Sequence, residues 1–408
     1  MFIQELSHGE WEHPQTPFDE AMSGAMPSAK LHALWQTLET AAGPFRGVES
    51  TRVQAGEHGQ VALITCKFDH DRLVAKITYD ARDRVAGIFF LPTPEASSVA
   101  WSAPSYVKSE ALEEHDVKVG VTPSLPGVLT VPKGSGPFPG VALVHGSGPM
   151  DEDESVGGVK VFKDIAWGLA SRGIAVLRYG KRSRYAPSGI VTQKEEVLDG
   201  VHDAIELLRH TPQIDSNKVF VIGHSQGGYL APRIAQQNPS LAGIVVLAGT
   251  TRSVEDSIVD QFTYFASLDP NNAKVAAALD GAKRFKQTVE DPNLRPEQDV
   301  EWPTGGRAKG AYFLDVRGYE PALVARSLSC KILVLQGERD YQVTMKDFAG
   351  RKEALVGSHT AVLKTYPSLN HLFASGSGTP TPAEYQRLGH VDAGVVDDIS
   401  EWLLRKGK

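Results

Sequence analysis

Residues 218–237, KVFVIGHSQGGYLAPRIAQQ, decide the fold of this 408-residue chain. Residues 218–222 are mostly apolar and suit a buried strand, and residues 227–237 have the periodicity of a helix. Between them lies GHSQG, a Gly-x-Ser-x-Gly turn centred on Ser225. Side chains in place of its two glycines would crowd the neighbouring elements, so we expect a sharp turn that strains Ser225 and holds it exposed at a helix N-terminus.

Apolar runs alternate with helical patterns on both sides of this stretch. Such alternation predicts the α/β class, with a mostly parallel central sheet covered by helices on both faces. Two strands that are expected to pair in antiparallel fashion, residues 117–121 and 127–131, precede the parallel strands in the chain. The expected strands are residues 140–144, 174–178, 218–222, 243–247, 331–335 and 361–365, and the expected helices are residues 161–171, 194–209, 227–237, 345–355 and 393–405.

Residues 1–105 are organised differently and are expected to form a small α+β domain. A helix is predicted over residues 29–41, with Ser28 as its N-cap, because apolar residues recur there at helical spacing. Four short strands follow, at residues 47–55, 61–68, 71–78 and 84–91. The pattern predicts a helix on a curved antiparallel sheet. A Pro- and Ser-rich segment, residues 92–105, has linker composition and places the boundary with residues 106–408 near residue 105.

One connection is too long for an ordinary crossover, because roughly 80 residues separate the strand at 243–247 from the strand at 331–335. We expect an inserted helical cap over about residues 250–329. Its aromatic residues either line an acyl pocket or form the core of the cap itself. They are Phe262, Tyr264, Phe265, Phe285, Trp302, Tyr312 and Phe313.

A serine hydroxyl is a poor nucleophile unless a base, itself oriented by a carboxylate, accepts its proton. Asp340 follows the strand at 331–335 and His371 follows the strand at 361–365. The ends of parallel strands meet at one edge of a sheet. We therefore predict a catalytic triad of Ser225, His371 and Asp340.

Other residues compete for two of these roles. Glu338 and Asp347 are alternative acids, and Asp340 is preferred because of the turn at Gly337, three residues before it. His224, His359 and His390 are alternative bases, but none of them lies in the loop after the last predicted strand.

Acyl transfer also requires hydrogen-bond donors for the oxyanion. The backbone N–H of Gln226, directly after the nucleophile, is the first expected donor. The loop after residues 140–144 reads HGSGP, and the N–H of Ser147 is the preferred second donor, with Gly148 as the alternative. His145 is expected to brace this loop.

Composition excludes several classes of function. A net charge of -7 and a pI near 6.0 provide no basic surface for nucleic acid. No zinc or dinucleotide signature is found, and no metal or cofactor is expected. The acidic run at residues 151–154 lacks calcium-loop spacing, so we expect a solvated loop or one that is ion-paired with Arg178, Lys181, Arg182 and Arg184. No signal peptide and no membrane span are recognised, which favours the cytoplasm.

The motifs HGSGP, GHSQGG, GERD and the His371 loop resemble bacterial α/β-hydrolases of the dienelactone-hydrolase and acylaminoacyl-peptidase-like branch. This resemblance covers roughly residues 115–408 and implies an α/β-hydrolase fold and hydrolysis of small-molecule carboxylic esters without a cofactor. Residues 28–92 resemble a cystatin-like domain of uncharacterised function, with a homodimer contact as one expected role. Two alternatives remain open: a peptidase or acylamino-acid hydrolase, and a noncatalytic binding or scaffold protein.

Overall fold

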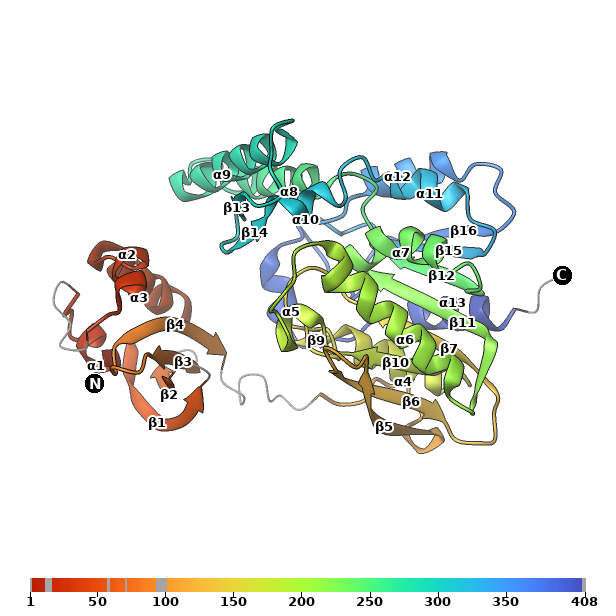
Figure 1. The fold of residues 1–408 in the computed structure, drawn as a ribbon, viewed down its shortest axis with the longest axis horizontal. Coiled ribbons are helices and arrows are strands. Elements are labelled where there is room, and N and C mark those ends of the chain that lie inside the picture. Colours follow the sequence, from red (N-terminus) through yellow and green to blue (C-terminus); the bar gives the residue numbers. More distant parts are fainter. Residues whose placement is uncertain (1, 12–16, 57–58, 70–71, 93–100, 406–408) are drawn as a thin grey trace. The chain divides into compact units, whose positions relative to one another are not determined.

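The computed structural model describes residues 2–11, 17–56, 59–69, 72–92 and 101–405. The chain divides into two compact units, Met1–Trp101 and Ser102–Lys408 (Figure 1). Most of the expected linker, residues 93–100, lies outside the described residues. No helix in the described part of the chain combines the length and the apolar character needed to cross a membrane.

The N-terminal unit contains a four-stranded sheet in which each strand is antiparallel to the next. Its strands are β1 (Phe45–Gly56), β2 (Gly59–Phe68), β3 (Arg72–Tyr79) and β4 (Val85–Pro92), in that order. Helix α3 (Ser28–Ala42) contributes Leu31 and Trp35 to a core shared with Ile64 and Ile77 of the sheet. The expected helix on an antiparallel sheet is confirmed.

Two details of the N-terminal unit differ from the sequence prediction. Ser28 is the first helical residue of α3, and Pro27 holds the N-cap position without a side-chain hydrogen bond. Two short helices, α1 (Phe2–Ser7) and α2 (Glu20–Ala25), were not expected. Helix α1 forms where Phe2, Ile3 and Leu6 are buried in the core, so tertiary packing rather than a long periodic pattern stabilises it.

The second unit is built on an eight-stranded sheet with the order β16-β15-β12-β11-β7-β10-β6-β5. The six strands from β16 to β10 are parallel, and β6 and β5 continue the sheet in antiparallel fashion. The predicted mostly parallel α/β sheet is therefore confirmed. The strands are β5 (Leu112–Val119), β6 (Leu125–Pro132), β7 (Phe138–Val144), β10 (Ala175–Tyr179), β11 (Ile214–His224), β12 (Gly243–Leu247), β15 (Lys331–Gly337) and β16 (Ala361–Tyr366).

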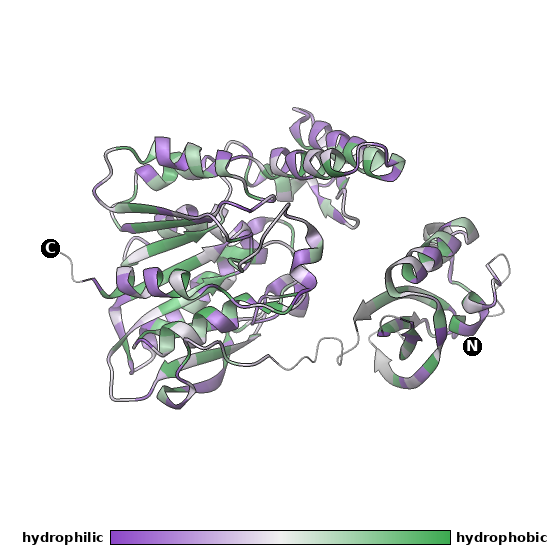
Figure 2. Ribbon diagram, turned by 180° about the vertical axis from the view of Figure 1, so that it is seen from behind, coloured by the Kyte–Doolittle hydropathy of each residue, from purple (hydrophilic) through white to green (hydrophobic). Residues whose placement is uncertain are grey.

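Helices cover both faces of this sheet. Helices α6 (Asp199–His210), α7 (Gln226–Gln237) and α12 (Met345–Ala354) pack on one face, whereas α4 (Val161–Ala170) and α13 (Ala393–Leu404) pack on the other. A π-helical turn, Lys194–Leu198, leads into α6. In Figure 2 the strands are largely hydrophobic and the helices have both polar and apolar sides, as expected for elements with one solvent-facing side.

The chain between β12 and β15 forms an insertion at the carboxyl ends of the strands. Its long helices α8 (Val254–Leu268) and α9 (Ala273–Glu290) lie side by side at the top of Figure 1. The hairpin of β13 (Asp299–Glu301) and β14 (Arg307–Lys309) follows, and then α10 (Gly310–Leu314) and α11 (Pro321–Arg326). The predicted cap corresponds to this segment of the chain.

Candidate active site

Ser225 lies at the junction of β11 and α7, where the sequence predicted a strained turn. Its backbone has φ 52° and ψ -111°, a conformation that costs a non-glycine residue about 1–3 kcal/mol. The Ser225 N–H donates to the Leu247 carbonyl at 2.9 Å, and the Gly227 N–H donates to the His145 carbonyl at 2.9 Å. The strained turn is therefore held by hydrogen bonds to the end of β12 and to the loop after β7.

Two glycines are required by close backbone contacts around this turn. A Cβ atom on Gly223 would lie 2.2 Å from the Gly227 carbonyl oxygen. A Cβ atom on Gly227 would lie 2.1 Å from the Val144 carbonyl oxygen. Both distances are far below van der Waals contact, so the backbone could not keep this path with any other residue at either position.

His371 and Asp340 are brought together beside the turn. The His371 Nδ1 atom lies 2.7 Å from Asp340 Oδ2. Asp340 Oδ1 accepts the N–H groups of Gln342 at 2.8 Å and Val343 at 2.9 Å. The carboxylate is thereby fixed on one side by the backbone and presents its second oxygen to Nδ1 of the imidazole.

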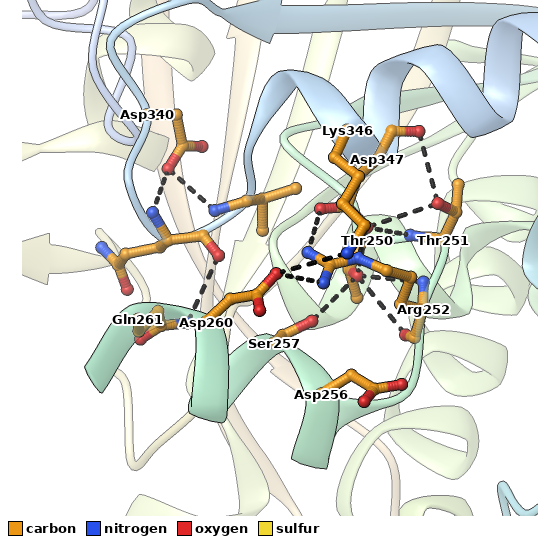
Figure 3. Close-up of polar contacts among 12 residues, drawn as sticks. Thr250, Thr251, Arg252, Asp256, Ser257, Asp260, Gln261, Asp340, Lys346 and Asp347 are labelled. Carbon is orange, nitrogen blue, oxygen red and sulfur yellow. Dashed lines mark hydrogen bonds and ion pairs between the residues drawn. The ribbon is translucent and has the colours of Figure 1, made fainter. Parts of the chain in front are cut away.

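The competing acid Asp347 has a different role. Its carboxylate accepts hydrogen bonds from Arg252 Nη2 at 2.8 Å and from the Thr250 hydroxyl at 2.8 Å, and it joins the start of the insertion to α12 (Figure 3). Figure 3 shows Asp340 apart from this cluster. Glu338 accepts the Thr365 hydroxyl at 2.7 Å on the protein surface. Neither carboxylate contacts an imidazole.

The competing histidines are also accounted for. His390 Nδ1 lies 3.2 Å from the Asp164 carboxylate, and His359 is exposed. His224 is buried, with its Nε2 2.9 Å from the His371 carbonyl oxygen and its Nδ1 3.0 Å from Glu154 Oε2. Burial lowers the pKa of His224, but the negative charge of Glu154 outweighs burial and raises that pKa above its ordinary value. His224 thus contacts the main chain of His371 and not the Asp340 carboxylate.

The loop after β7 passes close to Ser225. A Cβ atom on Gly146 would lie 3.2 Å from the Ser225 Cβ atom, and the Gly146 N–H donates to Glu154 Oε1 at 2.6 Å. Within the described residues, neither the Ser147 N–H nor the Gln226 N–H donates to a protein acceptor. Both N–H groups therefore remain open to another acceptor.

His145 braces this loop, as predicted. Its Nε2 atom lies 2.9 Å from the Asp151 carbonyl oxygen. Burial lowers the pKa of His145 to about 4, so the ring is neutral at pH 7.

A buried polar cluster next to Gln226 was not predicted. The Lys181 ammonium donates to the Gly146 carbonyl at 2.7 Å and to Gln226 Oε1 at 2.6 Å, and it pairs with Glu196 Oε1 at 3.3 Å. Gln226 Nε2 also donates to the Tyr312 hydroxyl of the insertion at 2.8 Å. The position of Lys181 just beyond the end of β10 was the available signal, since reactive groups gather at that edge of a parallel sheet.

The acidic run matches its prediction only in part. Arg178 Nε donates to Asp153 Oδ1 at 2.8 Å, which is one of the expected ion pairs. Lys181 pairs instead with Glu196, and Glu154 is buried under the loop at Gly146 rather than solvated. In the part of the chain that the structure describes, no group of three or more His, Cys, Asp or Glu residues is arranged to hold a metal ion.

The aromatic residues of the insertion divide between two environments. Phe285, Trp302 and Phe313 pack against one another within the insertion, with ring centroids 5.0–5.4 Å apart. Tyr264 stacks on Tyr341, the residue after Asp340, at 5.5 Å. The first group belongs to a hydrophobic core within the insertion.

Comparisons with known proteins agree with this architecture. The model of the dienelactone hydrolase family matches residues 127–267, and the model of the BAAT / acyl-CoA thioester hydrolase C terminal matches residues 198–347. A family described as a protein of unknown function (DUF3887) matches residues 1–88.

Individual relatives cover different shares of the chain. Esterase EstD of Thermotoga maritima is 35% identical over 408 residues, covering 99% of this chain and 94% of that protein. Acyl-coenzyme A amino acid N-acyltransferase 2 of Rattus norvegicus is 25% identical and covers 68% of this chain and 58% of that protein. The solved structure of the Pyrococcus furiosus esterase Pf2001 has a TM-score of 0.46 and 15% identity, covering 80% of this chain and 98% of that chain.

Proposed function

The chain belongs to the dienelactone-hydrolase-like serine esterases, and from that membership we propose that it hydrolyses carboxylic esters of short to medium acyl chain through Ser225, His371 and Asp340. The observation that carries this proposal is the buried pair of His371 Nδ1 and Asp340 Oδ2, 2.7 Å apart. It lies beside a serine held in a strained turn with φ 52°.

In the proposed mechanism His371 Nε2 accepts the proton of the Ser225 hydroxyl as its oxygen attacks the ester carbonyl carbon. Asp340 stabilises the imidazolium that results and keeps the ring proton on Nδ1. His371 then returns the proton to the departing alkoxide, which leaves an acyl-enzyme. Water, deprotonated by His371, attacks the acyl-enzyme, and collapse of the second tetrahedral intermediate releases the carboxylic acid and regenerates Ser225.

The oxyanion is proposed to be held by the backbone N–H groups of Gln226 and Ser147. Gln226 begins α7, so the partial positive charge of that helix N-terminus adds to its hydrogen bond. The proximity of Gly146 to Ser225 supports the choice of Ser147, because the next N–H along the chain borders the same space. Preorganised donors of this kind need no reorientation as charge develops.

The test is hydrolysis of p-nitrophenyl acetate, butyrate and octanoate by the wild type and by Ser225→Ala. We expect the variant to lose at least about 10⁴-fold in kcat, since the remaining groups cannot form an acyl-enzyme. A fluorophosphonate probe should label the wild type and leave Ser225→Ala unlabelled. Turnover retained by Ser225→Ala would overturn the assignment of the nucleophile.

A thioester is the second candidate substrate class. The specific observation is the match of residues 198–347, which include the nucleophile and the proposed acid, to the acyl-CoA thioester hydrolase C-terminal model. Comparing kcat/KM for butyryl-CoA and p-nitrophenyl butyrate distinguishes the two candidates. Turnover of an N-acyl-alanine p-nitroanilide would instead support the peptidase or acylamino-acid alternative.

The cellular location and the partners of the protein stay predictions. These are a cytoplasmic location, the absence of nucleic-acid binding and a homodimer contact made by the N-terminal unit. Light scattering on the full chain measures the oligomeric state directly.

A further inference from the structure

Lys181 is a buried cation beside the proposed oxyanion hole. Its side chain is 3% exposed, and its ammonium reaches the Gly146 carbonyl at 2.7 Å, Gln226 Oε1 at 2.6 Å and Glu196 Oε1 at 3.3 Å. An ammonium group has three hydrogens, and each has a protein acceptor here. Lys181 therefore has no donor left for a substrate and can act only through the groups that it holds.

The first of these groups sets the direction of the Ser147 N–H. The carbonyl of Gly146 and the N–H of Ser147 belong to one planar trans peptide unit, in which they point in opposite directions. A hydrogen bond from Lys181 to that carbonyl turns the Ser147 N–H away from Lys181. The preceding peptide unit is fixed as well, because the Gly146 N–H donates to Glu154 at 2.6 Å. Gly146 thus cannot rotate without breaking a buried hydrogen bond on one side or the other.

The second group belongs to the residue that carries the other oxyanion donor. Gln226 Oε1 accepts from Lys181, while Gln226 Nε2 donates to Gln193 Oε1 at 2.9 Å and to the Tyr312 hydroxyl at 2.8 Å. These contacts hold the first residue of α7 at both ends of its amide. One ammonium therefore binds both halves of the hole, which come from residues far apart in the chain.

Glu196 balances the charge of Lys181. It lies in the π-helical turn before α6, is 8% exposed, and also accepts the hydroxyl of Tyr312. A buried cation without such a partner would be strongly destabilising. The pair is consequently best removed as a unit when its role is tested.

We propose that Lys181, paired with Glu196, is a positioning residue that aligns the Ser147 and Gln226 N–H groups with the oxyanion. The inference rests on the proposed esterase mechanism and adds to it the element that keeps both donors in place. Loss of a whole oxyanion donor lowers kcat by about 10²–10³-fold. Both donors persist when Lys181 is removed but are free to turn away, so a decrease of about 10–100-fold in kcat is expected.

The test uses the full chain carrying Lys181→Met, and Lys181→Met combined with Glu196→Gln, which leaves no unpaired buried charge. With p-nitrophenyl butyrate, we expect kcat to fall about 10–100-fold and KM to stay within about threefold, because only the transition state loses stabilisation. The matched control is Lys160→Met. It removes an ammonium paired with Asp153 at 2.9 Å in the neighbouring loop and should leave kcat unchanged.

Inhibition by 1,1,1-trifluoro-2-pentanone separates positioning from a general loss of structure. Ser225 adds to its carbonyl carbon, His371 takes the proton, and the hemiketal oxyanion occupies the hole. In the Lys181 variants, the inhibition constant of the trifluoroketone should rise by the same factor as kcat falls. A kcat in the double variant within threefold of the wild type, or a fall in kcat without weaker inhibition, would overturn the proposal.

Failure of the underlying mechanism has a separate signature. If the wild type is not labelled by a fluorophosphonate probe, or if Ser225→Ala retains turnover, the proposed function fails. If Ser225 is labelled and essential while the Lys181 variants keep their kcat, only the positioning role fails. A melting temperature of the double variant near that of the wild type ensures that the comparison concerns folded protein.

Discussion

Asp340→Asn changes one atom at the centre of the proposed triad. In the wild type Asp340 Oδ1 accepts two backbone N–H groups at 2.8 and 2.9 Å, and Oδ2 faces His371 Nδ1 at 2.7 Å and Gln336 Nε2 at 3.1 Å. An asparagine must keep its oxygen on the backbone side, so its amide nitrogen turns toward His371. Since that nitrogen is a donor, the imidazole can pair with it only by moving its own proton to Nε2, where it blocks general-base catalysis.

The size of the effect follows from the same geometry. A carboxylate and an imidazolium with charge centres about 4 Å apart attract each other by about 4 kcal/mol at an effective dielectric constant near 20. Loss of that attraction in the transition state corresponds to about 10³-fold in kcat. The unfavourable tautomer adds to this, and the equivalent change in a Ser-His-Asp triad costs about 10⁴-fold. We therefore expect kcat to fall by about 10³–10⁴-fold.

The assay is kcat for p-nitrophenyl butyrate at pH 7 to 8, with Asp347→Asn as the matched control. Asp347 is a buried carboxylate of the same size, but it bonds Arg252 and Thr250 rather than an imidazole (Figure 3). Its variant should keep kcat within about threefold and lose about 1–3 kcal/mol of stability, the cost of weakening a buried hydrogen-bonded group. A kcat for Asp340→Asn within tenfold of the wild type, in protein with an unchanged melting temperature, would refute the reasoning.

Two further predictions concern stability. Burial raises the pKa of the Asp347 carboxyl, but the hydrogen bonds and charge of Arg252 outweigh burial and lower that pKa. The ionised carboxylate therefore stabilises the folded state fully above the unfolded pKa of about 3.9. That stabilisation is lost as the pH falls through the folded pKa. Melting temperatures from pH 7 to pH 3 should fall more steeply for the wild type than for Asp347→Asn, and parallel curves would contradict this. Gly227→Ala, whose Cβ would lie 2.1 Å from the Val144 carbonyl oxygen, should prevent accumulation of folded protein, as circular dichroism would show. The control is Gly281→Ala on α9, where a Cβ would make only an ordinary contact of 3.9 Å with the Arg284 side chain, and it should raise stability by about 0.5–1 kcal/mol. A folded, active Gly227→Ala would contradict the contact argument.

Most elements of the second unit were predictable because their signals are local. The strand Gly243–Leu247 has the predicted bounds, and α12 and α13 end within one residue of their predicted ends. Continuous apolar runs report burial on both sides of a sheet, and this requirement does not depend on which strands are neighbours. The helices α1 and α2 were missed because each has six residues, too few to show a helical period.

The sequence alone determined that a sharp turn surrounds Ser225, because Gly223, Ser225 and Gly227 lie in one short stretch between a predicted strand and a predicted helix. The sequence favoured Asp340 over Asp347 as the partner of His371, but only the tertiary structure shows the contact, with His371 Nδ1 2.7 Å from Asp340 Oδ2. The tertiary structure also decided the partner of Lys181. The sequence suggested the acidic run at residues 151–154, whereas in the structure Lys181 pairs with Glu196. A hydrogen bond depends on distances of about 3 Å between atoms, and residues from separate loops reach that distance only through the packing of the whole sheet.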